Sequence, residues 1–362
     1  MKKYLTRQEV ISVIERKGAA AHVPVFFLNW WGTGTEEKYG EELIHLEEEY
    51  PADIYCGEML QPGDAEAPLG WKNPDYRWGY RDYTGAEQHS IARIPVLMEE
   101  WEELELLMES FPDPMEPGVL DGAIAGLEKA GDRYRLGLFW KLFHEWFWQI
   151  RGMENLMGDY VEDVDNLKIL GRRALEYHKV VVDRFAQAGF DGILTSDDLG
   201  FQTGPMIQPA VFHELMLPLY KEFVDYVHEK GMHVWLHSCG DNTLLMDDLI
   251  AAGIDVLHPI QKGCMDEGAI HEKYRDKITF LYGIDVQNLI PRGTPEEIRK
   301  EVRRAKELLG APEGGLMLAA ANGIMPDTPL ENIQALFEEA YRDREDVPKE
   351  ELISFGFTVP GE

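Results

Sequence analysis

The chain has 362 residues, of which 44% are hydrophobic and 28% charged, as is typical of globular proteins. Acidic residues outnumber basic ones by 66 to 35, which gives a formal net charge of −31. Such a charge repels phosphate backbones and anionic lipid surfaces, so we expect no nucleic-acid or membrane partner. Charged residues interrupt the N-terminal segment, which argues against a signal peptide. With only three cysteines, the composition indicates a reducing cytoplasm instead of a disulfide framework.

Short, nearly continuous apolar segments predict β-strands that are buried on both faces. Eight of them occur in chain order, at residues 24–30, 52–57, 135–140, 190–198, 233–240, 255–261, 278–285 and 315–322. Helical patterns lie between them, so the sequence predicts an α/β fold, a (β/α)8 TIM barrel, in one domain over residues 1–362. A doubly wound open sheet would show similar alternation with a less exact strand count.

Threonines mark the predicted beginnings of three helices. Thr6, Thr294 and Thr328 are each followed three positions later by a glutamate. This spacing predicts a capping box, in which the two side chains bind the first backbone N–H groups of the helix. Gly310 predicts the end of the second helix.

The spacing between strands is irregular at one place, because residues 58–134 exceed an ordinary connection between the second and third strands. Within this insertion, residues 75–96 alternate in polarity and turn around Thr84–Gly85, which predicts a β-hairpin. Residues 97–110 predict a helix. We expect the insertion to cover one mouth of the barrel.

Polar residues follow most of the predicted strands. Barrel enzymes build their sites from the C-terminal ends of the strands, so these side chains should converge on one mouth. They are Asn29, Glu58, Asp197, Asp198, His237, Cys239, His258, Gln261, Asp285, Gln287 and Asn322.

His237 and Cys239 are two positions apart at a strand end, so both side chains should point the same way and could share one Zn²⁺. A catalytic zinc takes three protein ligands. We expect His258, on the neighbouring strand, to be the third, with Glu58 or Cys264 as alternatives. The other interpretation is a hydrogen-bonded histidine beside a cysteine that packs as a small hydrophobic residue.

Asp197 and Asp198 are candidate catalytic acids or bases, because neighbouring carboxylates repel each other and raise one pKa. Adjacent strand residues face opposite ways, so only one should face the mouth. Candidate substrate-binding residues are Asn29, Gln261, Asp285, Gln287 and Asn322. The aromatic residues of segment 139–152 could line a flat ligand or pack the core or an interface.

Several segments resemble the uroporphyrinogen decarboxylase superfamily, which also contains cobamide-dependent methyltransferases. The resemblance is carried by residues 151–160, 190–209, 237–261, 282–302 and 322–333. It implies the barrel fold, and it suggests a homodimer.

The resemblance implies two chemistries. Uroporphyrinogen decarboxylases hold their substrate's carboxylates with an arginine-rich segment at the first strand's end, whereas "FLNWWGTG" here has no basic residue. The methyltransferases carry His-x-Cys at the fifth strand, where zinc activates a thiol that accepts methyl from a methylcorrinoid. Their further cysteine near the last strand is absent from residues 319–322.

The leading hypothesis is therefore a methyltransferase that moves a methyl group between a corrinoid carrier protein and a small thiol or pterin. The alternative is decarboxylation of uroporphyrinogen or another aromatic acid, with Asp197 or Asp198 stabilising a protonated ring. A third hypothesis is a non-catalytic barrel that binds a corrinoid or tetrapyrrole.

Overall fold

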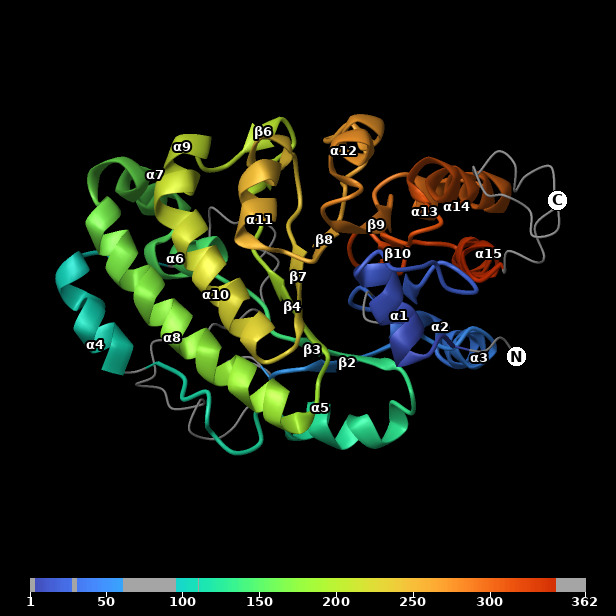
Figure 1. Ribbon diagram of the computed structural model, residues 1–362, viewed down its shortest axis with the longest axis horizontal. Helices are drawn as coiled ribbons and strands as arrows, with labels where there is room; N and C mark the ends of the chain where they lie inside the picture. The colour runs from blue at the N-terminus through green and yellow to red at the C-terminus, as the bar shows by residue number, and fades with distance from the viewer. Residues whose placement is uncertain (1–3, 28–30, 61–95, 110, 343–362) are drawn as a thin grey trace.

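Eight parallel strands form one sheet, which curls into a nearly closed barrel (Figure 1). The computed structural model describes residues 4–27, 31–60, 96–109 and 111–342. The strands of the barrel are β1 (Val25–Phe26), β2 (Ile54–Glu58), β3 (Tyr134–Leu138), β4 (Gly192–Ser196), β7 (His233–His237), β8 (Val256–His258), β9 (Thr279–Ile284) and β10 (Leu316–Ala320). Each lies at a predicted strand. The strand order β1-β10-β9-β8-β7-β4-β3-β2 follows the chain around the barrel without reversing, so the (β/α)8 prediction is confirmed and the doubly wound alternative is wrong.

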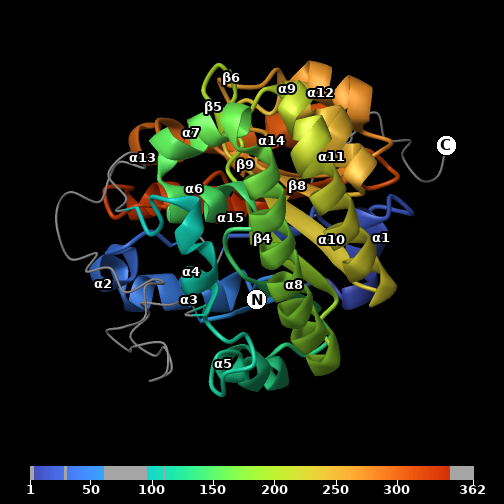
Figure 2. The same ribbon diagram turned by 90° about the vertical axis from the view of Figure 1, so that its left-hand side faces the viewer.

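Helices surround the strands, as the two views show (Figures 1 and 2). The longest, α8 (Val164–Ala188), lies beside α10 (Leu217–Glu229). The others are α1 (Arg7–Ile14), α2 (Thr35–Tyr39), α3 (Glu41–Glu49), α4 (Leu104–Glu109), α5 (Asp121–Ala125), α6 (His144–Arg151), α7 (Met153–Glu162), α9 (Pro209–Val211), α11 (Met246–Ala252), α12 (Glu267–Tyr274), α13 (Leu289–Arg292), α14 (Pro295–Leu309) and α15 (Leu330–Ala340). A small antiparallel pair, β5 (Gly200–Phe201) and β6 (Gly204–Pro205), follows β4.

Two of the three predicted capping boxes are present. Thr6 begins α1 and Thr294 begins α14, each with its reciprocal glutamate. The prediction for Thr328 is wrong, because Pro329 is the N-cap of α15 and no side chain caps this helix. Thr328 instead belongs to the preceding turn, where its N–H donates to the carbonyl of Met325.

The insertion between β2 and β3 is described in part. The predicted hairpin over residues 75–96 lies almost entirely outside the described residues. The predicted helix over residues 97–110 is present as a single 3₁₀ turn, Trp101–Glu103, that continues into α4.

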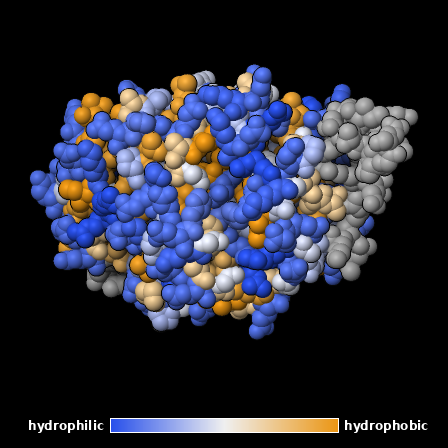
Figure 3. Space-filling view, in the orientation of Figure 1, coloured by the Kyte–Doolittle hydropathy of each residue, from blue (hydrophilic) through white to orange (hydrophobic). Residues whose placement is uncertain are grey.

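The barrel interior is filled by large side chains. Trp235 on β7 is fully buried and contacts Phe26 on β1 and Tyr134 on β3, so these rings pack together in a core and not in an open channel. On the outer surface, Figure 3 shows a face that is mostly hydrophilic, with apolar residues interspersed. Among the described residues, no helix combines the length and apolar character needed to cross a membrane.

Candidate active site at the barrel mouth

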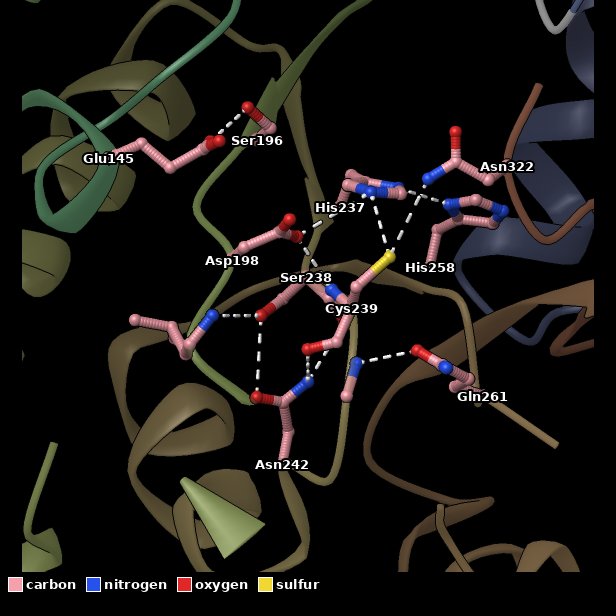
Figure 4. Close-up of polar contacts among 12 residues, drawn as sticks. Glu145, Ser196, Asp198, His237, Ser238, Cys239, Asn242, His258, Gln261 and Asn322 are labelled. Atoms are coloured by element: carbon pink, nitrogen blue, oxygen red, sulfur yellow. Dashed lines mark hydrogen bonds and ion pairs between the residues drawn. The ribbon is translucent and has the colours of Figure 1, made fainter. Parts of the chain in front are cut away.

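Three potential metal ligands meet at the C-terminal ends of β4 and β7 (Figure 4). The ligand atoms of Asp198, His237 and Cys239 all lie within 4.8 Å of one another. Nε2 of His237 is 3.4 Å from Sγ of Cys239 and 3.6 Å from Oδ1 of Asp198. The same Asp198 oxygen accepts the backbone N–H of Cys239 at 2.8 Å. A nitrogen, a thiol and a carboxylate therefore face one point.

His258 lies behind this cluster. Its Nε2 is 2.9 Å from the carbonyl of Ala320, and its Nδ1 is 2.7 Å from Nδ1 of His237. A carbonyl only accepts, so Nε2 of His258 carries the proton. Burial lowers the pKa of both histidines, so both rings are neutral near pH 7. His237 must then donate from Nδ1 to His258, which leaves the lone pair of its Nε2 directed at Cys239 and Asp198.

Burial and the charge of Asp198 raise the pKa of the Cys239 thiol, an effect that a hydrogen bond from Asn322 opposes. The amide nitrogen of Asn322 is 3.8 Å from Sγ. Without a cation, Cys239 is therefore a neutral thiol.

Asp197 and Asp198 face opposite ways, as strand geometry predicted. Asp197 is fully buried and accepts the backbone N–H groups of Phe143, His144 and Glu145 at 3.3, 3.1 and 2.8 Å. The hydroxyl of Tyr220 donates to it as well. These bonds satisfy the N-terminus of α6, so Asp197 serves to hold this helix and Asp198 faces the mouth.

Glu145, in the first turn of α6, is a polar residue of the mouth that no sequence pattern predicted. Only 9% of it is exposed, and the hydroxyl of Ser196 donates to its Oε2. Burial raises its pKa well above the usual value, and the charges of Asp198 and Asp197 raise it further. Its environment consequently favours the protonated, neutral form of the carboxyl.

Trp140 and Glu58 form part of the wall of the mouth. The indole Nε1–H of Trp140 donates to Oε1 of Glu58 at 2.6 Å. The Trp140 ring stands edge-on to His237, with 6.4 Å between ring centroids. The other five aromatic residues of segment 139–152 are buried in the core, so most of this segment packs the fold and Trp140 alone of the six faces His237.

The remaining candidates differ in position. Oε1 of Gln261 accepts the backbone N–H of Gly240 at 2.7 Å and so holds the loop that carries Cys239. Asp285 accepts backbone N–H groups at the start of α13, and Gln287 is exposed beside it. Cys264 lies half-buried in the loop after β8. Asn29 falls outside the described residues.

The loop after β7 is held tightly against β5. Gly240 has a φ of +85°, and a Cβ there would overlap the backbone of Gly200. Only glycine combines this conformation with so close an approach, so the pair fixes the backbone of Cys239.

Comparison with known proteins assigns the chain to a protein family. The family model described as uroporphyrinogen decarboxylase (URO-D) matches residues 148–342. The chain belongs to this family. The match contains Asp198, His237, Cys239 and His258, whereas Glu58, Trp140 and Glu145 precede it.

Two similar proteins come from Methanosarcina mazei. A methylated-thiol–coenzyme M methyltransferase is 26% identical over 135 residues, which are 36% of this chain and 32% of that protein. The alignment thus spans about a third of the length of that curated relative. A solved structure titled "methyltransferase from Methanosarcina mazei" has a TM-score of 0.62 at 16% identity, over 93% of this URO-D family chain and 98% of the other. That likeness shows the shared fold.

Proposed function

We propose that this URO-D family protein is a methyltransferase that moves a methyl group between a methylcorrinoid carrier protein and a small thiol. The observation that carries the proposal is the meeting of Asp198, His237 and Cys239 at the barrel mouth. A zinc-bound thiol is the nucleophile that such a site can supply. The name of the M. mazei relative, which includes a methylated thiol and the thiol coenzyme M, supports the substrate class.

Two of the three distances between ligand atoms match a zinc site, and the third pair, Asp198 and Cys239, lies within 4.8 Å. Zinc–ligand bonds of about 2.0 to 2.3 Å at tetrahedral angles imply ligand atoms about 3.4 to 3.6 Å apart. The pair of His237 and Cys239 is 3.4 Å apart, and the pair of His237 and Asp198 is 3.6 Å apart. We therefore assign Asp198, in place of His258, as the third ligand. Three protein ligands leave one position for a substrate thiol.

The residues of the chain prepare this site before any ion binds. His258 fixes the tautomer of His237, so that Nε2 is the ligand atom. Asp198 holds the backbone of Cys239 and adds negative charge. Zinc, when bound there, would lower the pKa of a thiol and hold it as the thiolate. The carboxylate of Asp198 would replace the second cysteine of the related methyltransferases.

Decarboxylation is less well supported. A decarboxylase of a polycarboxylate needs cationic groups in its site, whereas Glu58, Glu145 and Asp198 are acidic. Asp197, one of the two residues expected to stabilise a protonated ring, has its oxygens bonded to α6 and Tyr220. A reduced pterin could also bind at this mouth as the methyl acceptor, and its methylation would not require zinc.

The test is an assay of methyl transfer from methylcobalamin to a small thiol. The loss of methylcobalamin absorbance measures the rate. We expect zinc-loaded wild type to catalyse it, Cys239→Ala to lose at least 100-fold in rate, and Glu154→Gln, an exposed site on α7, to match wild type. Transfer that persists in Cys239→Ala would contradict the proposal. Turnover of uroporphyrinogen by the same preparation would favour decarboxylation.

A further inference from the structure

A second polar group lies in the mouth beside the metal-binding cluster. Figure 4 shows Glu145 and Ser196 on one side of His237, with Asn322 and His258 on the other. Burial and the charge of Asp198 raise the pKa of both the Glu145 carboxyl and the Cys239 thiol, so the two groups share one electrostatic environment. Neither Glu145 nor Ser196 is needed to bind a metal.

The hydrogen bonds around Glu145 determine what it can offer a ligand. The backbone N–H of Lys141 donates to the hydroxyl oxygen of Ser196 at 3.0 Å, and the Ser196 hydroxyl donates to Oε2 of Glu145. Among the described residues, none forms a hydrogen bond with the other oxygen, Oε1. A carboxyl that is about nine-tenths buried thus retains one oxygen for a ligand.

The surroundings keep this carboxyl neutral. Burial raises the pKa of the neighbouring Asp197 to about 6, although hydrogen bonds from Tyr220 and from backbone N–H groups of α6 oppose this shift, so Asp197 is mostly a carboxylate near pH 7. Lys141 acts in the opposite direction, but its effect on the pKa of Glu145 is smaller than those of Asp198 and Asp197. A cation at Asp198 would offset that charge, whereas burial and Asp197 would remain. The carboxyl groups of Glu145 and Asp197 have different environments, which separate their pKa values, so that Glu145 is the acid of the pair and Asp197 the base.

We propose that Glu145, held by Ser196, is a substrate-binding residue whose carboxyl donates a hydrogen bond from Oε1 to an uncharged oxygen of the substrate. This inference rests on the proposed methyl transfer. It specifies the substrate class as an uncharged small thiol that carries a hydroxyl, ether or carbonyl oxygen. Anionic thiols are disfavoured because Glu58 and Asp197 would repel them.

The kinetic test compares 2-mercaptoethanol, which is uncharged and carries a hydroxyl, with the sulfonate thiol coenzyme M. We expect a lower KM for 2-mercaptoethanol in wild type. Glu145→Ala should raise that KM about tenfold, as for one lost hydrogen bond, and leave the KM for coenzyme M nearly unchanged. Glu145→Gln should largely restore it, since an amide N–H also donates. Equal effects on both thiols, or no effect, would overturn the proposal.

A second readout does not need turnover. Difference infrared spectra of zinc-loaded protein with and without 2-mercaptoethanol should contain a neutral carboxyl band that shifts on binding. The band should be absent from Glu145→Gln and present in Glu154→Gln. If no variant transfers methyl groups, the proposed function fails while this band still tests Glu145. A spectrum without a shifted carboxyl band in wild type would refute the role of Glu145.

Discussion

His237 and His258 are joined through their Nδ1 atoms at 2.7 Å, and the second ring is anchored on the carbonyl of Ala320. When both rings are neutral, this arrangement permits one pair of tautomers. His258 carries its proton on Nε2 and His237 carries its proton on Nδ1. His258 therefore acts on the metal site from behind, through the orientation of His237. Partners of this kind commonly change metal affinity 10- to 100-fold.

His258→Phe should accordingly weaken zinc binding by about 10- to 100-fold, because His237 loses the acceptor that fixes its tautomer. A competitive chelator titration measures the change. His213→Phe is the matched control, since His213 is 69% exposed and pairs with Asp248 on the surface. Unchanged affinity in His258→Phe would show that the tautomer is fixed by other means.

Substitutions of Asp197 and Asp198 should have different effects, one on the stability of the fold and the other on metal binding. Asp197→Ala leaves the N-terminal N–H groups of α6 without their acceptor, which should lower the free energy of unfolding by about 3 kcal/mol. Asp198→Ala should lose zinc with a much smaller change in stability. Urea unfolding and metal content, measured on both variants, check this. The reverse pattern would mean that the two roles are exchanged.

Glu301 on α14 should make the free energy of unfolding depend on pH in the acidic range. Burial raises its pKa, but Arg304 and Lys262 outweigh burial and lower that pKa to about 2. A carboxyl whose pKa is lower in the folded state stabilises above its unfolded pKa of about 4, and this contribution is lost as pH falls toward 2.

Glu301→Gln should therefore lower the free energy of unfolding by about 2 kcal/mol at neutral pH, and the difference from wild type should shrink between about pH 4 and pH 2. Urea unfolding at several pH values measures it. Glu307→Gln, an exposed site on the same helix, should leave stability unchanged throughout. A difference that persists undiminished at pH 2 would argue for a packing effect.

Gly240→Ala tests the loop that carries Cys239. The new Cβ would overlap the Gly200 backbone and the φ of +85° would be strained, so we expect a loss of at least about 2 kcal/mol and weaker zinc binding. Gly18→Ala, where a Cβ meets nothing within 4 Å, is the control. Normal zinc binding in Gly240→Ala would show that Cys239 does not depend on this contact.

The sequence predicts the fold well because each barrel strand is an apolar segment long enough to recognise locally. His237 and Cys239 are also predictable, since two residues two positions apart on one strand must face the same way. The role of His258 depends on ring orientation and on a carbonyl 62 residues away, which no local pattern encodes. Glu145 on α6 was missed for the same reason: Ser196, which donates to it, lies 51 residues away at the end of β4, and the charge of Asp198 just beyond raises its pKa. The prediction for Thr328 was wrong because the spacing of a threonine and a glutamate does not determine which residue becomes the N-cap of the helix.

The most direct test of the central claim is the zinc content of wild type, Cys239→Ala and His237→Ala, purified side by side without a metal-binding tag and measured by elemental analysis. The account predicts one zinc per chain in wild type and little in either variant. Full zinc retention in both variants, or wild type that takes up no zinc from a zinc-buffered solution, would contradict it.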